Sequence, residues 1–220
     1  MEIIEIKNYL EHNEIQNKEI LENFLNKDQE HYLRSNLFGH ITGSAFILNK
    51  EMDKALLILH GKYNKWVSPG GHVDEGETAK VASKRESQEE VGLNNLEYLS
   101  QEIFDIDIHV IPGKKKDNVF EPEHWHFDVR YIFINPNNEN VNLNELEAKG
   151  FKYESLDVLR SDADPSIARQ AEKAIELVGN LKKAKKMKIS WLFLEFEIQF
   201  KYCGFSSVGR ASACQALGRQ

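Results

Sequence analysis

The chain has 220 residues, of which 41% are hydrophobic, so it can bury one sizeable core and carry additions to it. Its formal net charge of −7 argues against a general affinity for nucleic acid or for acidic membranes. Both cysteines, Cys203 and Cys214, lie near the end of the chain, which leaves no disulfide elsewhere and suits a reducing cytoplasm. The first residues do not show the basic and then apolar pattern of a signal peptide.

Residues 1–38 predict a helical N-terminal extension made of two short helices. Apolar residues share one face of each helix: Ile3, Ile6 and Leu10 in the first, and Ile20, Leu21, Phe24 and Leu25 in the second. Two roles are open for them, since they can form a homodimer surface or cover a sheet.

From His40 onward the pattern changes to strands. Residues 41–48 and 55–60 predict a hairpin, and further strands are expected at 99–110, 125–134 and 150–154. Asp164 and Pro165 are a favourable N-cap and first residue for a last helix. Its predicted inner face consists of Ile167, Ala171, Ala174, Val178 and Leu181. The fold class is therefore α/β, a mixed sheet with helices on both sides, over residues 39–182.

The glycine-rich segment Pro69-Gly70-Gly71 is predicted to turn the chain toward a helix over residues 79–91, with Thr78 as N-cap and Gly92 as its end. On that helix Glu86, Glu89 and Glu90 project together. Carboxylates at this density repel one another, so a cation is expected among them. Oxygen ligands suit Mg²⁺ or Mn²⁺.

The stretch from Gly71 to Leu93 resembles the signature of the Nudix hydrolases, G-x5-E-x7-R-E-U-x-E-E-x-G-U, where U is aliphatic. Each glycine and charged position of the pattern is matched, and Leu93 fills the last aliphatic position. The departure is Ser87, which stands where an aliphatic residue normally anchors the helix. Its hydroxyl can bond to the carbonyl of Ser83, so we interpret Ser87 as a packing weakness that leaves the chemistry intact.

The resemblance implies a Nudix-type α/β/α sandwich and a Mg²⁺-dependent hydrolase, with Mn²⁺ as the second choice. Glu86, Glu90 and the carbonyl of Gly71 are then the expected metal ligands, and Glu89 is either a ligand or the general base. Glu77 is expected to reach the same cluster from the start of the helix. Arg85 is expected to orient a carboxylate such as Glu77 through an ion pair.

A second group of candidate residues lies on one face of the strand at 125–134: His124, His126 and Asp128. We favour a role in lining the substrate pocket, while a solvated face and a transition-metal site remain alternatives. Lys65 is a candidate contact for substrate phosphate. Glu147 is a candidate for an extra carboxylate from outside the signature, against the alternative of a solvated acidic loop.

These residues predict hydrolysis of a diphosphate linkage between a nucleoside and another group, by attack of a metal-activated water on phosphorus. Candidate substrates include nucleotide sugars, ADP-ribose, nucleoside triphosphates and dinucleoside polyphosphates. One alternative is a silent nucleotide-sensing module, although such a domain would be expected to lose carboxylates that this chain keeps. Another is removal of pyrophosphate from RNA 5′ ends, which the acidic balance disfavours.

Residues 183–220 do not continue the pattern of the domain. The run from Lys182 to Lys188 is basic, and the segment that follows is apolar but interrupted by Glu195 and Glu197, so it is not expected to span a membrane. Ser206 to Ala211 can be encoded by the D-arm of a transfer RNA gene. We therefore interpret residues 183–220 as a tail read through from a neighbouring gene, without a function of its own.

Overall fold

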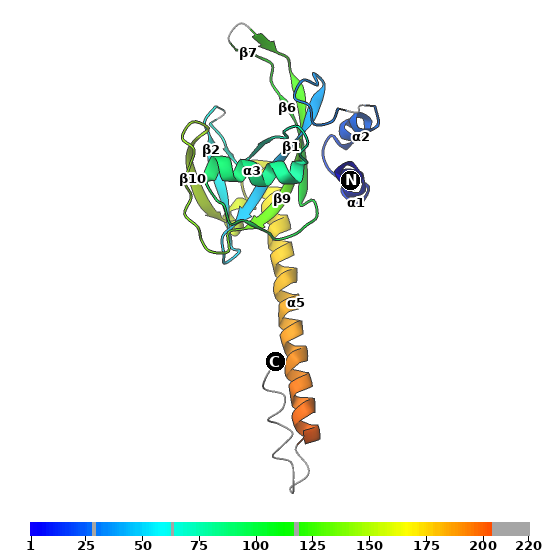
Figure 1. Cartoon of the computed structure of the whole chain (residues 1–220), viewed down its shortest axis with the longest axis vertical. Coiled ribbons are helices and arrows are strands. Elements are labelled where there is room, and N and C mark those ends of the chain that lie inside the picture. Colours follow the sequence, from blue (N-terminus) through cyan, green and yellow to red (C-terminus); the bar gives the residue numbers. More distant parts are fainter. Residues whose placement is uncertain (28–29, 63, 117–118, 204–220) are drawn as a thin grey trace. The chain divides into compact units, whose positions relative to one another are not determined.

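The computed structural model describes residues 1–27, 30–62, 64–116 and 119–203 of the chain. Contacts divide the chain after Ile175, and the first unit, Met1–Ile175, holds the sheet and every candidate residue of the signature. Figure 1 shows this unit with its main helices and strands labelled.

The sheet is mixed, and its longest pairing joins two distant segments of the chain in parallel. Its strands follow the order β10 (Ala148–Ser155), β2 (Lys54–His60), β1 (Gly39–Leu48), β9 (His124–Ile134) and β5 (Glu97–Tyr98). Three strands add to this path: β3 (Trp66–Val67) on β2, β4 (Gly70–His72) on β1, and β6 (Asp105–Ile111) on β9. Strands β1 and β2 form the predicted antiparallel hairpin, whereas β1 and β9 run parallel.

Helices lie on both sides of this sheet, as predicted. Helix α3 (Ala79–Val91) crosses one face, where Gly43 of β1 is so close to Ala79 that no side chain fits between them. The next residue of β1, Ser44, points to the other face. There Ser44 bonds Asp128, Asp128 bonds Arg130, and Arg130 bonds Ser166 in the first turn of α5 (Pro165–Cys203). The short helix α4 (Leu156–Leu159) lies between β10 and α5 in the chain.

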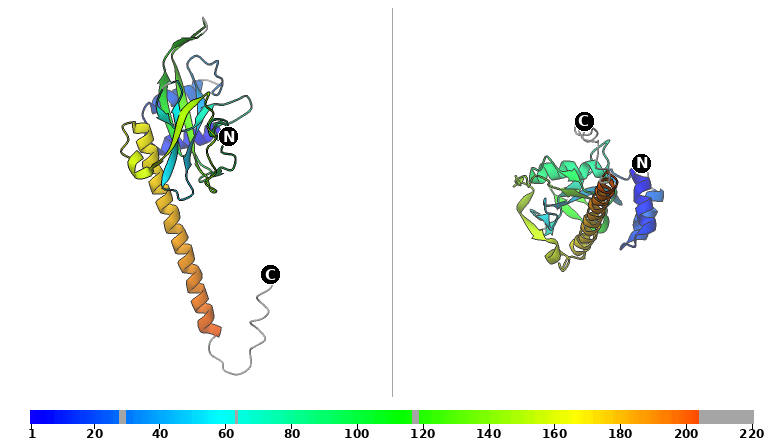
Figure 2. Two further views of the ribbon diagram at one scale, coloured as in Figure 1. Left: turned by 90° about the vertical axis from the view of Figure 1, so that its left-hand side faces the viewer. Right: turned by 90° about the horizontal axis from the view of Figure 1, so that it is seen from below.

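The N-terminal extension forms α1 (Glu2–His12) and α2 (Lys18–Lys27), and both helices bury the faces that the sequence predicts. Phe24 of α2 stacks on Phe127 of β9 with ring centroids 4.6 Å apart. Ile6, Leu10 and Leu21 belong to the same core cluster as the face of the sheet that α3 covers. Both helices therefore cover the sheet, and they lie to one side of it in Figure 1 and in the right-hand view of Figure 2.

The structure differs from the predicted elements in several places. The strand expected at 99–110 begins only at Asp105, as β6, because the polar run Ser100-Gln101-Glu102 precedes it, and the short β5 lies just before the expected range. The expected glycine turn contains strand β4. The hairpin of β7 (Lys114–Lys116) and β8 (Val119–Glu121) was not predicted. Leu181, expected on the inner face of the last helix, is 39% exposed.

Helix α5 continues past Lys182 to Cys203, so the helix itself does not end where the sequence places the end of the domain. That boundary remains a prediction. The segment from Ser206 to Ala211, on which the read-through interpretation rests, lies outside the described residues. None of the helices in the described part of the chain is long and apolar enough to cross a membrane.

Candidate active site

Helix α3 carries the acidic residues of the signature and is fixed at both ends. Thr78 accepts a hydrogen bond from the backbone N–H of Val81, and Gly92 ends the helix in a left-handed conformation with φ of 67°, as predicted. Near the end of α3, the backbone N–H of Asn144 donates to the carbonyl of Glu90 over 2.8 Å, and that of Asn142 donates to Val91 over 2.9 Å. The same loop carries Glu147 into the site.

A carboxylate from α1 completes the start of α3, which the sequence did not predict. The two oxygens of Glu2 accept the backbone N–H groups of Ala79 at 2.8 Å and Lys80 at 2.9 Å. The hydroxyls of Tyr32 and Tyr131 donate to the same carboxylate at 2.7 and 3.0 Å. A buried negative charge is stable here because the helix N-terminus offers unpaired N–H groups and a positive dipole end.

Arg85 joins the carboxylates of the signature. Its guanidinium donates to both oxygens of Glu77, to Glu86 at 2.9 Å and to Glu89 at 3.1 Å. It also donates to the carbonyl of His72 at 2.8 Å. The expected ion pair with Glu77 is therefore formed, and it extends to two further glutamates. A contribution of Arg85 to catalysis stays a prediction.

Ser87 is fully buried in α3 and donates its hydroxyl to the carbonyl of Ser83 over 2.7 Å, which confirms the predicted contact. The polar side chain thus leaves no unpaired hydroxyl in the core.

The glycines of β4 hold two carboxylates in place. The backbone N–H of Gly70 donates to Glu90 over 2.8 Å. A Cβ atom on Gly71 would lie 2.5 Å from the carboxyl carbon of Glu86, so this carboxylate packs directly against the glycine backbone. Only a residue without a side chain allows this approach.

Burial makes both of these acids harder to ionise. Burial raises the pKa of Glu90 to about 8, and the charge of Glu86 adds to the effect while the N–H of Gly70 opposes it. Burial also raises the pKa of Glu86, although the hydrogen bond from Arg85 acts against the rise. Two neighbouring buried carboxylates are difficult to ionise together, and a bound cation stabilises their ionised forms.

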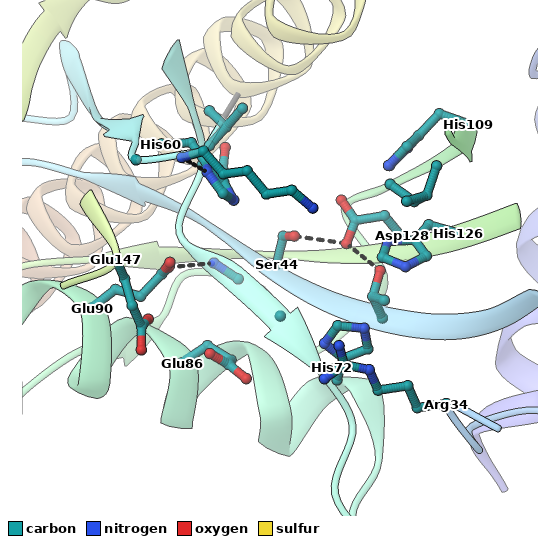
Figure 3. A pocket seen from close by; sticks show the side chains of 18 of the residues that line it. Arg34, Ser44, His60, His72, Glu86, Glu90, His109, His126, Asp128 and Glu147 are labelled. Carbon is teal, nitrogen blue, oxygen red and sulfur yellow. Dashed lines mark hydrogen bonds between the residues drawn. The ribbon is translucent and has the colours of Figure 1, made fainter. Parts of the chain in front are cut away.

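Glu86 and Glu90 open on a cavity of about 600 Å³, shown in Figure 3. Of the predicted site residues, those that line it are Gly71, Glu86, Glu90, His124, His126, Asp128 and Glu147. Glu77, Arg85, Glu89 and Lys65 are not among the described residues of its wall, and the Glu89 side chain is 54% exposed. Cationic side chains from other segments also line it: Arg34, Lys62, Lys114 and Arg130.

Five histidines form a cluster, and four of them, His72, His109, His124 and His126, line the cavity. The sequence singled out two of the five as candidates. His40 on β1 lies opposite His126 on β9, and their ring centroids are 4.7 Å apart. His124 is 5.2 Å from each of them, and His72 and His109 flank the group. Burial lowers the pKa of His40 and of His72 to about 4, and it lowers that of His126 further, so these imidazoles are neutral at pH 7.

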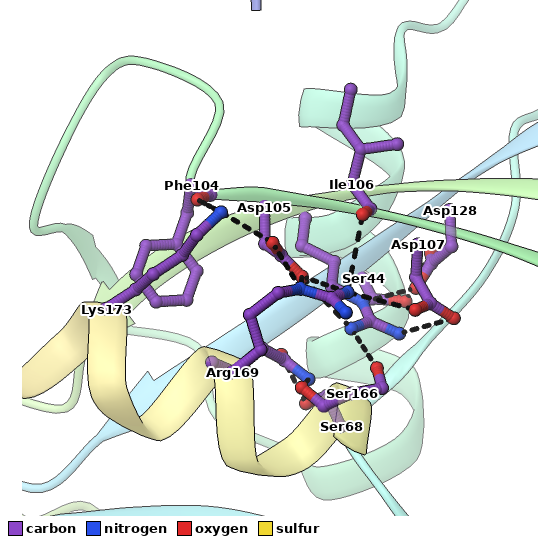
Figure 4. A network of polar contacts seen from close by, with 12 residues as sticks. Ser44, Ser68, Phe104, Asp105, Ile106, Asp107, Asp128, Ser166, Arg169 and Lys173 are labelled. Carbon is purple, nitrogen blue, oxygen red and sulfur yellow. Dashed lines mark hydrogen bonds and ion pairs between the residues drawn. The ribbon is translucent and has the colours of Figure 1, made fainter. Parts of the chain in front are cut away.

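Asp128, the third candidate on β9, belongs to a buried network of charges. One oxygen accepts from the hydroxyls of Ser44 at 2.6 Å and Thr42 at 3.1 Å, and the other accepts from Arg130 at 2.8 Å. Arg130 and Arg169 also pair with Asp105 and Asp107. Figure 4 shows Arg169 beside both of these carboxylates. Arg130 was not predicted as a site residue, although it follows Asp128 by two positions. It therefore shares the strand face of His124, His126 and Asp128.

The structure thus defines an α/β/α sandwich in which one acidic helix faces a cavity. A family model described as NUDIX domain matches residues 40–177, which is well over half of the chain. The chain belongs to this family, and it is a Nudix pyrophosphohydrolase.

Several solved structures are similar to this chain. A hydrolase of the NUDIX family from Clostridium perfringens is 26% identical, with a TM-score of 0.43 over 63% of this chain and 97% of that one. A C. elegans Ap4A hydrolase binary complex is 18% identical, with a TM-score of 0.41 over 64% and 98%. The NUDIX domain of Shewanella oneidensis NrtR complexed with ADP ribose is 18% identical, with a TM-score of 0.45 over 71% and 97%. The comparison with curated proteins gave no match.

Proposed function

We propose that this protein is a divalent-metal-dependent hydrolase that cleaves the diphosphate linkage of a nucleoside diphosphate derivative, with water attacking phosphorus. The observation that carries the proposal is the convergence of Glu86, Glu90 and the backbone of Gly70 and Gly71 on one cavity.

The donor set fits a hard divalent cation. Glu86 and Glu90 would hold it together with the carbonyl oxygen of Gly71, and all three offer oxygen, which suits Mg²⁺ first and Mn²⁺ second. Burial raises the pKa of both carboxyls, and a bound cation would favour their ionised forms. When bound, such an ion neutralises phosphate oxygens and lowers the pKa of a coordinated water.

The protein's own groups then position the reactants. Arg85 holds Glu77, Glu86 and Glu89 in a fixed arrangement through its guanidinium. Arg34, Lys62 and Lys114 give the cavity wall positive charge, which suits a diphosphate. The Glu89 side chain lies on the exposed side of the cluster. If Glu89 is the general base, it must contact the attacking water at the mouth of the cavity.

A hydrolysis panel tests this proposal. The full-length protein, with Mg²⁺ or Mn²⁺, is expected to cleave at least one of the nucleotide sugars, ADP-ribose, nucleoside triphosphates or dinucleoside polyphosphates. If Glu89 is the base, Glu89→Gln should lower kcat by about 10²-fold or more with Mn²⁺ affinity unchanged. If it is a ligand, kcat and Mn²⁺ affinity should fall together.

The matched control is Glu75→Gln, which removes an exposed carboxylate from the loop before α3 and should leave turnover at the wild-type level. Nucleotide binding without turnover in either metal would instead identify a silent sensing module. Unchanged activity of Glu89→Gln would refute both roles of that residue.

A further inference from the structure

Three histidines, of which His124 and His126 line the cavity, lie close enough together to share one ion. His40 on β1 pairs in register with His126 on β9, and His124 lies two residues earlier on the same face of β9. One ring nitrogen from each of the three lies within 4.8 Å of the others. In a tetrahedral site with bonds of about 2.0–2.1 Å, nitrogens lie about 3.3 Å apart, so modest rotations of the imidazoles close the site.

Several ring nitrogens of these histidines have no hydrogen-bond partner among the described residues, which leaves them available to bind a metal ion. His40 is 1% exposed, yet neither of its ring nitrogens has a hydrogen-bond partner among the described residues. The Nε2 of His126 is likewise buried and without a partner within the described part of the chain. Buried polar atoms are rarely left in this state, so their absence of partners points to a ligand.

The third ring is oriented by a backbone contact. The carbonyl of Pro122 can only accept, so the Nδ1 of His124 carries the hydrogen and donates to it over 2.9 Å. This fixes the tautomer that leaves Nε2 of His124 available. A ligating histidine usually makes such a bond through its other ring nitrogen.

We propose that His40, His124 and His126 form a second metal site, for a first-row transition-metal ion of the Zn²⁺ type, with a fourth position open to the cavity. Neutral imidazole favours Zn²⁺ and similar ions over Mg²⁺, which takes oxygen. Figure 3 shows His126 and the Glu86–Glu90 pair on opposite sides of the cavity, so the two sites differ in place as well as in ligand type.

Cobalt spectroscopy tests the proposal on the full-length protein. The protein is stripped of metal with a chelator, saturated with Mg²⁺ to occupy the carboxylates, and titrated with Co²⁺. We expect one Co²⁺ per chain with the intense visible bands of tetrahedral nitrogen coordination, and displacement by Zn²⁺. His124→Gln and His126→Gln should each weaken Co²⁺ binding at least about tenfold.

Two control variants test whether Co²⁺ binds to these three histidines and not to neighbouring residues. His109→Gln removes a histidine 5.6 Å from the His126 ring that is not one of the three, so binding should be retained. Glu90→Gln should also retain the tetrahedral bands while impairing hydrolysis. Circular dichroism and melting of the metal-free variants check that they fold.

The wild-type spectrum alone can overturn the proposal, even if a variant fails to fold. Weak octahedral bands would place Co²⁺ on oxygen ligands, and thiolate charge-transfer bands would place it on Cys203 or Cys214. Wild-type Co²⁺ affinity in both folded histidine variants would also contradict it and leave the cluster as a lining of the substrate pocket.

Discussion

The absence of a side chain at Gly71 leaves room for the carboxylate of Glu86. A Cβ atom there would meet the Glu86 carboxyl at 2.5 Å, so Gly71→Ala should displace this carboxylate and any metal that it holds. A misplacement of about 1 Å in a catalytic group lowers turnover by about 10²-fold, and we expect a loss of this size. Steady-state kinetics at saturating Mg²⁺, together with thermal melting, measures it.

Gly150→Ala is the matched control, because a Cβ at Gly150 in β10 meets no atom within 4 Å. It should leave turnover unchanged. If Gly71→Ala keeps wild-type turnover while folding normally, the contact with Glu86 is not what the glycine provides.

Single residues were predictable where their role is encoded by local spacing. Ser87 and Ser83 lie one helical turn apart, and the predicted hydrogen bond is formed. The pair of Arg85 and Glu77 was expected from their places in the signature, and it is formed. Glu2 had no such signal, because its partners at Ala79 and Lys80 are far away in the sequence. From the sequence alone, a carboxylate in an amphipathic helix is expected to be exposed, and only the tertiary structure shows that this one is buried.

At the scale of elements, α1 stabilises α3 through Glu2. Glu2→Ala removes the acceptor of two backbone N–H groups and leaves the Tyr131 hydroxyl without its partner in a buried place. Loss of a helix cap costs about 1 kcal/mol and an unpaired buried group adds about as much, so the free energy of unfolding should fall by about 2 kcal/mol. Urea unfolding of the full chain measures this change.

Glu5→Ala provides the comparison, since Glu5 is exposed on the same helix. Its free energy of unfolding should stay within about 0.5 kcal/mol of the wild type. Equal stability of the two variants would show that the carboxylate of Glu2 does not hold α3.

The longer elements were predicted and the shortest ones were missed. Runs of residues that favour strands located β1, β2 and β9, the helical period located α1 and α2, and the terminal residues Thr78 and Gly92 located α3. Strand β4 is three residues of Gly-Gly-His with no strand propensity, and its pairing with β1 is a tertiary effect. The two-residue strand β5 was missed because it is too short to show a period, and its pairing with β9 is a tertiary contact.

At the scale of the whole molecule, the parallel pairing of β1 with β9 assembles the cavity. It brings His40 beside His126 and Ser44 beside Asp128. The pairing of β4 with β1 places Gly71 beside Gly43 of the same strand. No local pattern reports a contact between residues more than eighty positions apart. The sequence therefore identified the acidic half of the cavity through a motif but only part of the histidine half.

The most direct test of the account is the binding of Mn²⁺ measured by the electron paramagnetic resonance of the free ion. The wild-type protein and the control Glu75→Gln should bind Mn²⁺ alike, and Glu90→Gln should bind it at least about tenfold more weakly and lose turnover in parallel. If Glu90→Gln binds Mn²⁺ with wild-type affinity and cleaves substrate at the wild-type rate, the carboxylates of α3 are not the metal site of this enzyme.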